Sequence, residues 1–472
     1  MSNTRAIAHN TIVQIIGKGI STIIGVVVVG LLTRYLGEAG FGQYTIVMAY
    51  LQLFGILVDM GLYVILVKRI SEPGIDADAV ASNILTLRLI SAVVFLGLAP
   101  LVILFFDYPS IVKMGVLITT LSFFGITLNQ VLSGIFQKHM RMDKVVIAEV
   151  VGRIVLVAGT YGCVVLDLNL LWILAVVSVS SLVNFMMTYV FSRQFIRLRL
   201  RFDWEVWRSV IRDAWPIALS IGFNLLYFKT DVLFLSHYQG DAAVGLYGAA
   251  NKVLEVLVTF PAMFAGLVLP LLTAAWVSGD RERFRGILQK SYDAMLMVAL
   301  PLIVGTMLLA DPIMHLVAPE FSASPDILRL LIVATGIIFV GNLFGNTVVA
   351  LNRQRATLWL YGAIAGIALV GYMVAIPAHS YYGAAVVRIV AEFLITLSMI
   401  SIVGITSKVW PRFGTMAKVV VACAAMGAVI FILRDAHVLL AIIGGVIAYG
   451  VGLLVMRAVT TDTIREIISI RR

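Results

Sequence analysis

Among the ionisable side chains inside stretches of this sequence that are apolar enough to cross a lipid bilayer, nine are candidates for chemistry. They are Lys18, Arg88, Arg153, Lys229, Asp231, Lys252, Glu255, Arg388 and Glu392. An ionised side chain at the centre of a bilayer costs roughly 2.5–3.5 kcal/mol on insertion scales. Nine such groups facing lipid would cost more than the whole stability of an ordinary fold. We therefore expect most of them to face a hydrated interior or one another.

The sign and spacing of these charges suggest what they bind. Six of the nine are basic, and a positive excess that faces water suits an anionic substrate. Lys252 and Glu255 are three residues apart, and Arg388 and Glu392 are four apart, so each pair shares a helix face. The carboxylates, Asp231 included, could carry a coupling proton or sodium ion. The alternative hypothesis is an interior ion-pair network that only holds helices together.

The elements that position these residues are predicted to be membrane-spanning helices. The chain has 472 residues, is 61% hydrophobic and 13% charged, and has a mean hydropathy of +1.02. Only helices and closed barrels satisfy the backbone in lipid, and these apolar stretches are too long for barrel strands. At about 20 residues a span, the sequence predicts an all-α, polytopic protein with fourteen transmembrane helices. The predicted spans are 11–34, 41–66, 82–106, 112–137, 145–166, 169–191, 213–236, 243–270, 292–310, 326–351, 356–377, 382–406, 415–433 and 437–457.

The loop charges predict the orientation of these spans. Cytoplasmic loops carry an excess of Lys and Arg. With both termini cytoplasmic, Arg34, Lys113 and Arg434 are the only basic residues on the predicted outer side. The formal net charge of +10 therefore orients the protein, and we expect no nucleic-acid partner.

A repeated turn suggests two like-oriented halves. The segment 34–44 reads RYLGEAGFGQY, and the segment 237–247 reads HYQGDAAVGLY, 203 residues later. Parallel repeats of this kind occur in transporters. We predict an N-terminal lobe of six helices (1–191), a connector (192–212), a second six-helix lobe (213–406) and an appended helix pair with a cytoplasmic tail (407–472). Trp204 and Trp207 among the connector arginines indicate a short helix at the membrane interface.

The turn at Thr33–Tyr44, with its R-x-L-G-x-x-x-F-G-x-Y pattern, resembles that of polysaccharide flippases of the Wzx type. So does the segment Asp231–Glu255, with its G-x-x-x-x-G-x-Y and K-x-x-E runs. Those proteins belong to the multidrug/oligosaccharidyl-lipid/polysaccharide (MOP) exporter superfamily. The resemblance implies two lobes, a central cavity open to one side and alternating access in the inner (cytoplasmic) membrane. The implied substrate is an undecaprenyl-diphosphate-linked oligosaccharide.

On the strength of this resemblance we expect seven basic residues to bind the diphosphate and acidic sugars. Asp231, Glu255 and Glu392 are the expected ion-coupling or charge-pair residues. Arg34, Asp231, Lys252 and Glu255 match the motifs, and the others are placed by depth alone. Polysaccharide polymerases and glycosyltransferases are the expected partners. The seven basic residues are Lys18, Arg34, Arg88, Arg153, Lys229, Lys252 and Arg388.

Other functions are less well supported by the sequence. A MOP exporter of lipid II or of a small molecule would share the helix count. A membrane-embedded polysaccharide polymerase or ligase would need larger outer loops than these. Cys163 and Cys423 lie in apolar stretches and the histidines are scattered, so we expect no metal, no cofactor and no enzymatic activity.

Overall fold

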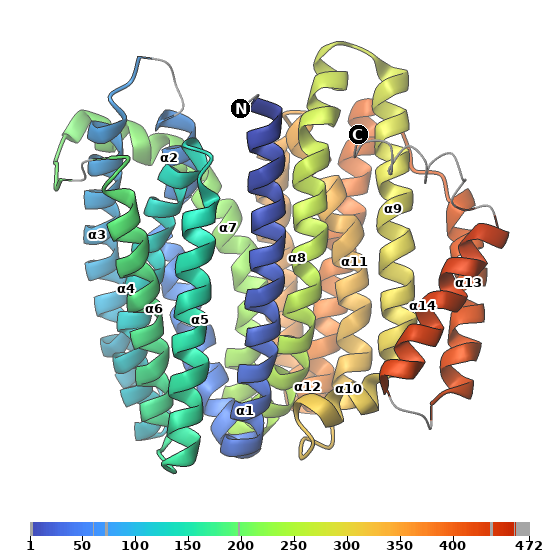
Figure 1. Cartoon of the computed structure of the whole chain (residues 1–472), viewed down its shortest axis with the longest axis horizontal. Helices are drawn as coiled ribbons and strands as arrows, with labels where there is room; N and C mark the ends of the chain where they lie inside the picture. Colours follow the sequence, from blue (N-terminus) through green and yellow to red (C-terminus); the bar gives the residue numbers. More distant parts are fainter. Residues whose placement is uncertain are drawn as a thin grey trace. The chain divides into compact units, whose positions relative to one another are not determined.

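The computed structural model describes residues 3–59, 61–70, 74–196, 199–434, 438–456 and 458. In that part of the chain every regular element is a helix (Figure 1). Eleven of the described helices are long and apolar enough to cross a membrane. The all-α class and the multi-pass membrane character are thus confirmed. The count of fourteen and the cytoplasmic termini stay predictions, and the predicted tail beyond residue 458 lies outside the described residues.

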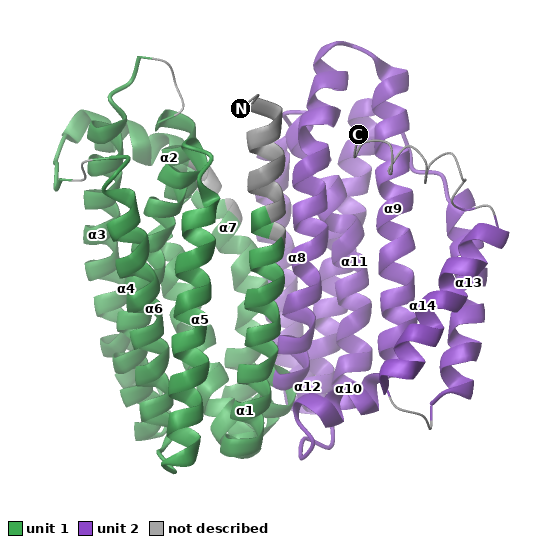
Figure 2. Ribbon diagram, in the orientation of Figure 1, with its two compact units in different colours: residues 1–248 green, residues 249–472 purple. Residues whose placement is uncertain are grey.

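The chain divides into two compact units, residues 1–248 and 249–472 (Figure 2). This division does not test the predicted lobe boundaries or the connector at 192–212, which stay predictions. The first unit contains α1 (Asn3–Asp59), α2 (Leu62–Ile70), α3 (Ala77–Val102), η1 (Ile103–Phe105), α4 (Ser110–Lys138), α5 (Met142–Val165), α6 (Leu170–Ser192), α7 (Trp204–Gln239) and the start of α8 (Asp241–Val277).

The second unit holds the rest of α8 and the six helices that follow. Here α11 packs against α12 and α9, and α13 packs against α14 and α9. The α10 helix is short and lies in what the sequence predicted to be an outer loop. The six helices are α9 (Arg281–Leu308), α10 (Ala310–Val317), α11 (Ser324–Ala350), α12 (Gln354–Ser407), α13 (Gly414–Ile432) and α14 (Val438–Val455).

Two of the long helices are each two helices merged across a break. The break in α1 is at Gly37 (φ 65°), and the break in α12 is at Ser380 (φ 51°). Positive φ has no place in a right-handed helix and is least costly for glycine. Both breaks fall where the sequence predicts turns, between 11–34 and 41–66 and between 356–377 and 382–406. The predicted 41–66 span ends early, since α1 stops at Asp59 and Gly61 adopts φ 71° before α2.

Polar side chains begin several of the helices. Asp76, Asn169, Asp203 and Asp280 each accept a hydrogen bond from a backbone N–H in the first turn of α3, α6, α7 and α9. Such caps satisfy donors that have no partner inside the helix. The predicted interfacial helix at Trp204 is the first part of α7, which continues without interruption to Gln239.

The predicted orientation can be tested on the second unit. Ser278 and Ser322 are exposed and lie at opposite ends of α9, in the α8–α9 and α10–α11 connections (Figure 1). In a chain with Cys163 and Cys423 replaced by alanine, we expect S322C to react with a membrane-impermeant maleimide on intact cells. S278C should react only after the cells are opened. The reverse pattern would overturn the orientation.

Candidate functional site

In the first unit, four of the predicted binding residues lie on α1, α5 and α7, and α1 packs against both other helices. Lys18 and Arg34 on α1 are exposed, and Arg153 and Lys229 are half-buried. The Nη1 atom of Arg153 lies beside Gly25 of α1. Lys229 Nζ lies 5.3 Å from the ring centroid of Phe228. These basic groups can each donate charge-assisted hydrogen bonds to a phosphate.

Asp231 has a different environment from its neighbour Lys229. Its side chain is 1% exposed. One carboxylate oxygen accepts a hydrogen bond from the Tyr247 hydroxyl (2.6 Å), and the other accepts one from the backbone N–H of Val232 (2.8 Å). Buried carboxylates are held by such donors. Asp231 is therefore part of the packing between α7 and the start of α8, and its coupling role stays a prediction.

Arg88 is enclosed within the first unit. Its side chain has no exposed surface, and Nη1 lies 2.7 Å from Asp59 Oδ1. The other terminal nitrogen donates to Gln130 of α4. Three helices, α1, α3 and α4, thus meet at one buried cation. This geometry favours the ion-pair interpretation of Arg88 over the substrate-binding one, which stays a prediction.

The two interpretations of Arg88 predict different results for R88M. If the residue is structural, breaking the buried pair costs about 3–5 kcal/mol and lowers the apparent Tm of the purified protein. The double variant D59L/R88M should recover most of that loss, because it leaves no unpaired charge. An R88M protein with wild-type Tm but no export would instead support the substrate-binding interpretation.

In the second unit, two polar pairs lie next to each other along α8. Lys252 Nζ lies 2.7 Å from Glu255 Oε2, and the two side chains are about a quarter to a third exposed, at 26% and 31%. The preceding residue, Asn251, accepts a hydrogen bond from Arg388 of α12 (2.8 Å). Arg388 and Glu392 are both 4% exposed. The predicted Lys252–Glu255 pair is confirmed, and it is the accessible member of this cluster.

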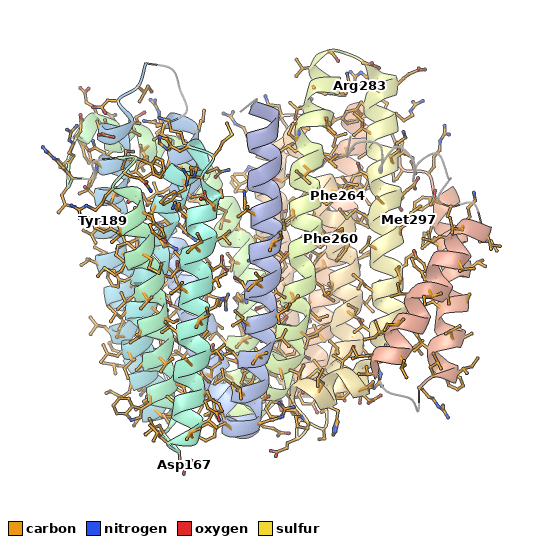
Figure 3. The ribbon with its side chains drawn as sticks, in the orientation of Figure 1. Asp167, Tyr189, Phe260, Phe264, Arg283 and Met297 are labelled. Atoms are coloured by element: carbon orange, nitrogen blue, oxygen red, sulfur yellow. The ribbon has the colours of Figure 1, made fainter. Side chains whose placement is uncertain are left out.

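Aromatic rings follow the Lys252–Glu255 pair along α8. Phe260 stacks on Phe264 at a centroid distance of 6.4 Å and on Phe339 of α11 at 6.0 Å (Figure 3). Phe260 is nonetheless 48% exposed. An accessible aromatic surface therefore lies within about two helical turns of an accessible charge pair.

The two copies of the repeated turn pack against each other within the first unit. Gly37 and Gly240 occupy equivalent places in the repeat, and both have positive φ, at 65° and 82°. A Cβ on Gly42 would overlap the backbone carbonyl of Asp241. A Cβ on Gly245, the equivalent residue, would overlap the backbone carbonyl of Glu38. The contact is thus reciprocal, which confirms the repeat as a structural one.

Hydrogen bonds extend this contact at the same end of the unit. Gln43 Nε2 donates to Asp241 Oδ2 (3.0 Å), and the Tyr35 hydroxyl donates to Asp167 Oδ1 (2.9 Å) in the α5–α6 turn. Burial raises the pKa of Tyr108, which precedes α4, and the nearby Asp241 carboxylate raises it further. Tyr108 therefore stays protonated and neutral at physiological pH.

Sequence reasoning missed several residues that complete these clusters. Asp59 was available as a signal, since it is an acid inside the predicted 41–66 span, yet it was not matched to Arg88. Asn251 and Gln130 are neutral, so a search for ionisable side chains inside the spans does not find them. The Tyr247 hydroxyl was interpreted only as part of a turn motif. Each of these is a partner supplied by another helix or another turn.

Comparison with known families and proteins gives several matches. Residues 7–276 match the family model described as "Polysaccharide biosynthesis protein". Residues 216–376 match the model described as "MatE". A curated relative from Haloferax volcanii, described as a probable low-salt glycan biosynthesis flippase, is 23% identical over 335 residues. That alignment covers 69% of each chain.

The fold also resembles solved structures. A lipid II flippase in an inward closed conformation superposes with a TM-score of 0.74 at 16% identity, covering 93% of this chain and 97% of that one. An inward-facing multidrug resistance transporter of the MOP superfamily gives 0.67 at 14% identity, covering 82% of this chain and 94% of that one. A MOP transporter from Pyrococcus furiosus, described as having a binding pocket of reverse polarity, gives 0.62 at 16% identity. Its coverage is 85% of this chain and 95% of that one.

Proposed function

Because this chain belongs to the polysaccharide biosynthesis protein family of the MOP exporter superfamily, we propose that it is a lipid-linked glycan flippase. The proposed substrate is an undecaprenyl-diphosphate-linked oligosaccharide repeat unit. The chain moves it from the cytoplasmic to the outer leaflet of the inner membrane by alternating access, for assembly of a cell-surface polysaccharide.

The observation that carries this proposal is accessible basic charge on membrane-spanning helices. Lys18 and Arg153 in the first unit, and Lys252 in the second, are at least partly exposed within apolar helices. A diphosphate is a compact anion that such groups recognise through charge-assisted hydrogen bonds. The exposed ring of Phe260, eight residues after Lys252 on α8, adds a surface on which a sugar face can stack.

Transport, not chemistry, is the activity we propose, in keeping with the flippase and transporters that the chain resembles. Asp231, Glu255 and Glu392 are the carboxylates available to take up a coupling proton or sodium ion. Polymerases and glycosyltransferases of the same pathway are the proposed protein partners, since they consume and supply the lipid-linked unit.

A second candidate is the flipping of lipid II, favoured by the TM-score of 0.74 with a lipid II flippase. The two candidates share a diphosphate and differ in the glycan. They are separated by presenting both lipids to the same purified protein.

A deletion strain of the native host tests the proposal. Without the chain, we expect the lipid-linked oligosaccharide to accumulate and to be protected from periodate added to intact spheroplasts. Expression of the wild-type gene should restore oxidation. An accumulated oligosaccharide that is fully oxidised without the chain would show that another protein flips it.

A further inference from the structure

The segment that enters α7 is fastened to α3 in an unusual way. Residues 199–203 precede the first turn of α7, and alternate backbone N–H groups in them each donate a hydrogen bond to a side-chain oxygen of α3. The pairs are Arg199 with Ser82 (3.2 Å), Arg201 with Thr86 (3.0 Å) and Asp203 with Asn83 (2.8 Å). Such bonds fix the backbone of the segment, so its side chains project from a defined track.

The first turns of α7 are anchored to the same unit on one face. The Asp203 side chain accepts from the backbone N–H groups of Glu205 and Val206. Trp207 is 7% exposed within an apolar cluster contributed by α2, α3 and α4. Arg69 at the end of α2 lies 2.7 Å from Asp213. Asp213 also lies 3.9 Å from Arg212, and Asp76 lies 3.9 Å from Arg201, so these carboxylates offset part of the positive charge of the five arginines in the stretch.

The same stretch combines exposed arginines with large exposed apolar side chains. Leu200, Phe202, Trp204 and Trp215 are 71%, 68%, 62% and 53% exposed. Five arginines of the same stretch are exposed as well. We call these residues the connector surface. It consists of Arg193, Arg199, Leu200, Arg201, Phe202, Trp204, Arg208, Arg212 and Trp215.

We propose that the connector surface is a binding site for anionic phospholipid headgroups of the cytoplasmic leaflet. Aromatic and aliphatic side chains of this kind insert at the boundary between headgroups and acyl chains, and arginines beside them attract anionic lipid. The hydrogen-bonded track on α3 holds both sets together, which lowers the ordering cost of binding. The proposal rests on the predicted orientation, because only then does this end of the unit meet the cytoplasmic leaflet.

The full-length protein in nanodiscs tests this proposal through Trp204. Emission is compared between wild-type protein and W204F, so that the difference reports Trp204 alone. In mixed bilayers, the quenching of the Trp204 component should show brominated phosphatidylglycerol enriched roughly fivefold around Trp204 over brominated phosphatidylcholine. An enrichment of this size is the effect of about one arginine near an anionic surface. The enrichment should fall in 0.5 M NaCl, where charges are screened.

Three charge variants complete the test. R199Q/R201Q/R208Q/R212Q should abolish the enrichment, and the corresponding lysine variant should keep it. R283Q/R285Q/R353Q/R355Q, which removes four exposed arginines from the second unit (Arg283 is labelled in Figure 3), should leave it unchanged. Equal quenching by the two lipids in wild-type protein would overturn the proposal. Enrichment that survives in R199Q/R201Q/R208Q/R212Q would also overturn the proposal. If that variant lost export as well, the loss would assign the surface to a protein partner.

Discussion

Replacing Lys252 with methionine is expected to lower export of the lipid-linked glycan by about tenfold to a hundredfold, with the protein still inserted at its normal level. A hydrogen bond to a charged group contributes about 1.5–3 kcal/mol, which corresponds to this range. Lys252 also neutralises Glu255 at 2.7 Å, so its loss leaves a carboxylate that repels the diphosphate. The measurement is the initial rate of export at several substrate levels, and we expect the apparent KM to rise.

Matched variants separate charge from packing at this position. K252R keeps the cation and should retain most of the export. K290M removes an exposed lysine in the first half of α9 and should have no effect. R153Q removes an accessible cation of the first unit and should resemble K252M. Wild-type export by both K252M and R153Q would remove the argument that these charges bind substrate.

Adding a methyl group at Gly42 or Gly245 is expected to slow export strongly without preventing insertion. Each new Cβ would overlap a backbone carbonyl of the other turn, and backbone cannot move aside as a flexible side chain can. Overpacking of this kind costs about 1–3 kcal/mol, which lowers the population of the conformation with packed turns by about 5- to 150-fold. Alternating access requires every conformation of the cycle to be reachable, so the cycle slows accordingly.

Gly97 provides the control for this prediction. It lies on α3, and no atom lies within 4 Å of the position that a Cβ would take there, so G97A should export normally and gain slightly in helix propensity. G42A and G245A should resemble each other, because their contacts are reciprocal. Normal export by both G42A and G245A would show that the packed turns are not part of the transport cycle.

The repeat shows how far the sequence alone reaches. Tyr35, Gly37, Gly42 and their equivalents are visible as letters at a constant spacing, and the positive φ of Gly37 and Gly240 follows from the turns that they form. The close approach of Gly42 to the backbone of Asp241, and of Gly245 to that of Glu38, does not follow from this pattern. It depends on how two distant segments pack, and no local pattern encodes that.

The buried charges also show which contacts can and cannot be predicted from the sequence. Spacing along one helix correctly paired Lys252 with Glu255, since residues three apart share a face. It could not pair Arg88 with Asp59, which comes from another helix. Depth in the bilayer predicts that a charge needs a partner, but it does not distinguish a partner side chain from water or substrate. Neutral partners such as Asn251 are not found by a search for charges inside the spans.

Helix ends were predicted where composition changes sharply and missed where it does not. The break at Ser380 falls between two apolar stretches and was expected. The α10 helix was not, because its eight residues lie between apolar neighbours and near prolines. The continuity of α7 from Trp204 was also missed, since charged and aromatic residues there were assigned to a separate interfacial helix.

The most direct test is reconstitution of the purified chain into proteoliposomes that contain an undecaprenyl-diphosphate-linked oligosaccharide in both leaflets. External periodate oxidises the outer half at once in all vesicles. With wild-type protein, we expect the oxidised fraction to rise to nearly all of the lipid, and with K252M to rise about tenfold to a hundredfold more slowly. A fraction that stays near half with correctly folded wild-type protein would contradict the proposed function.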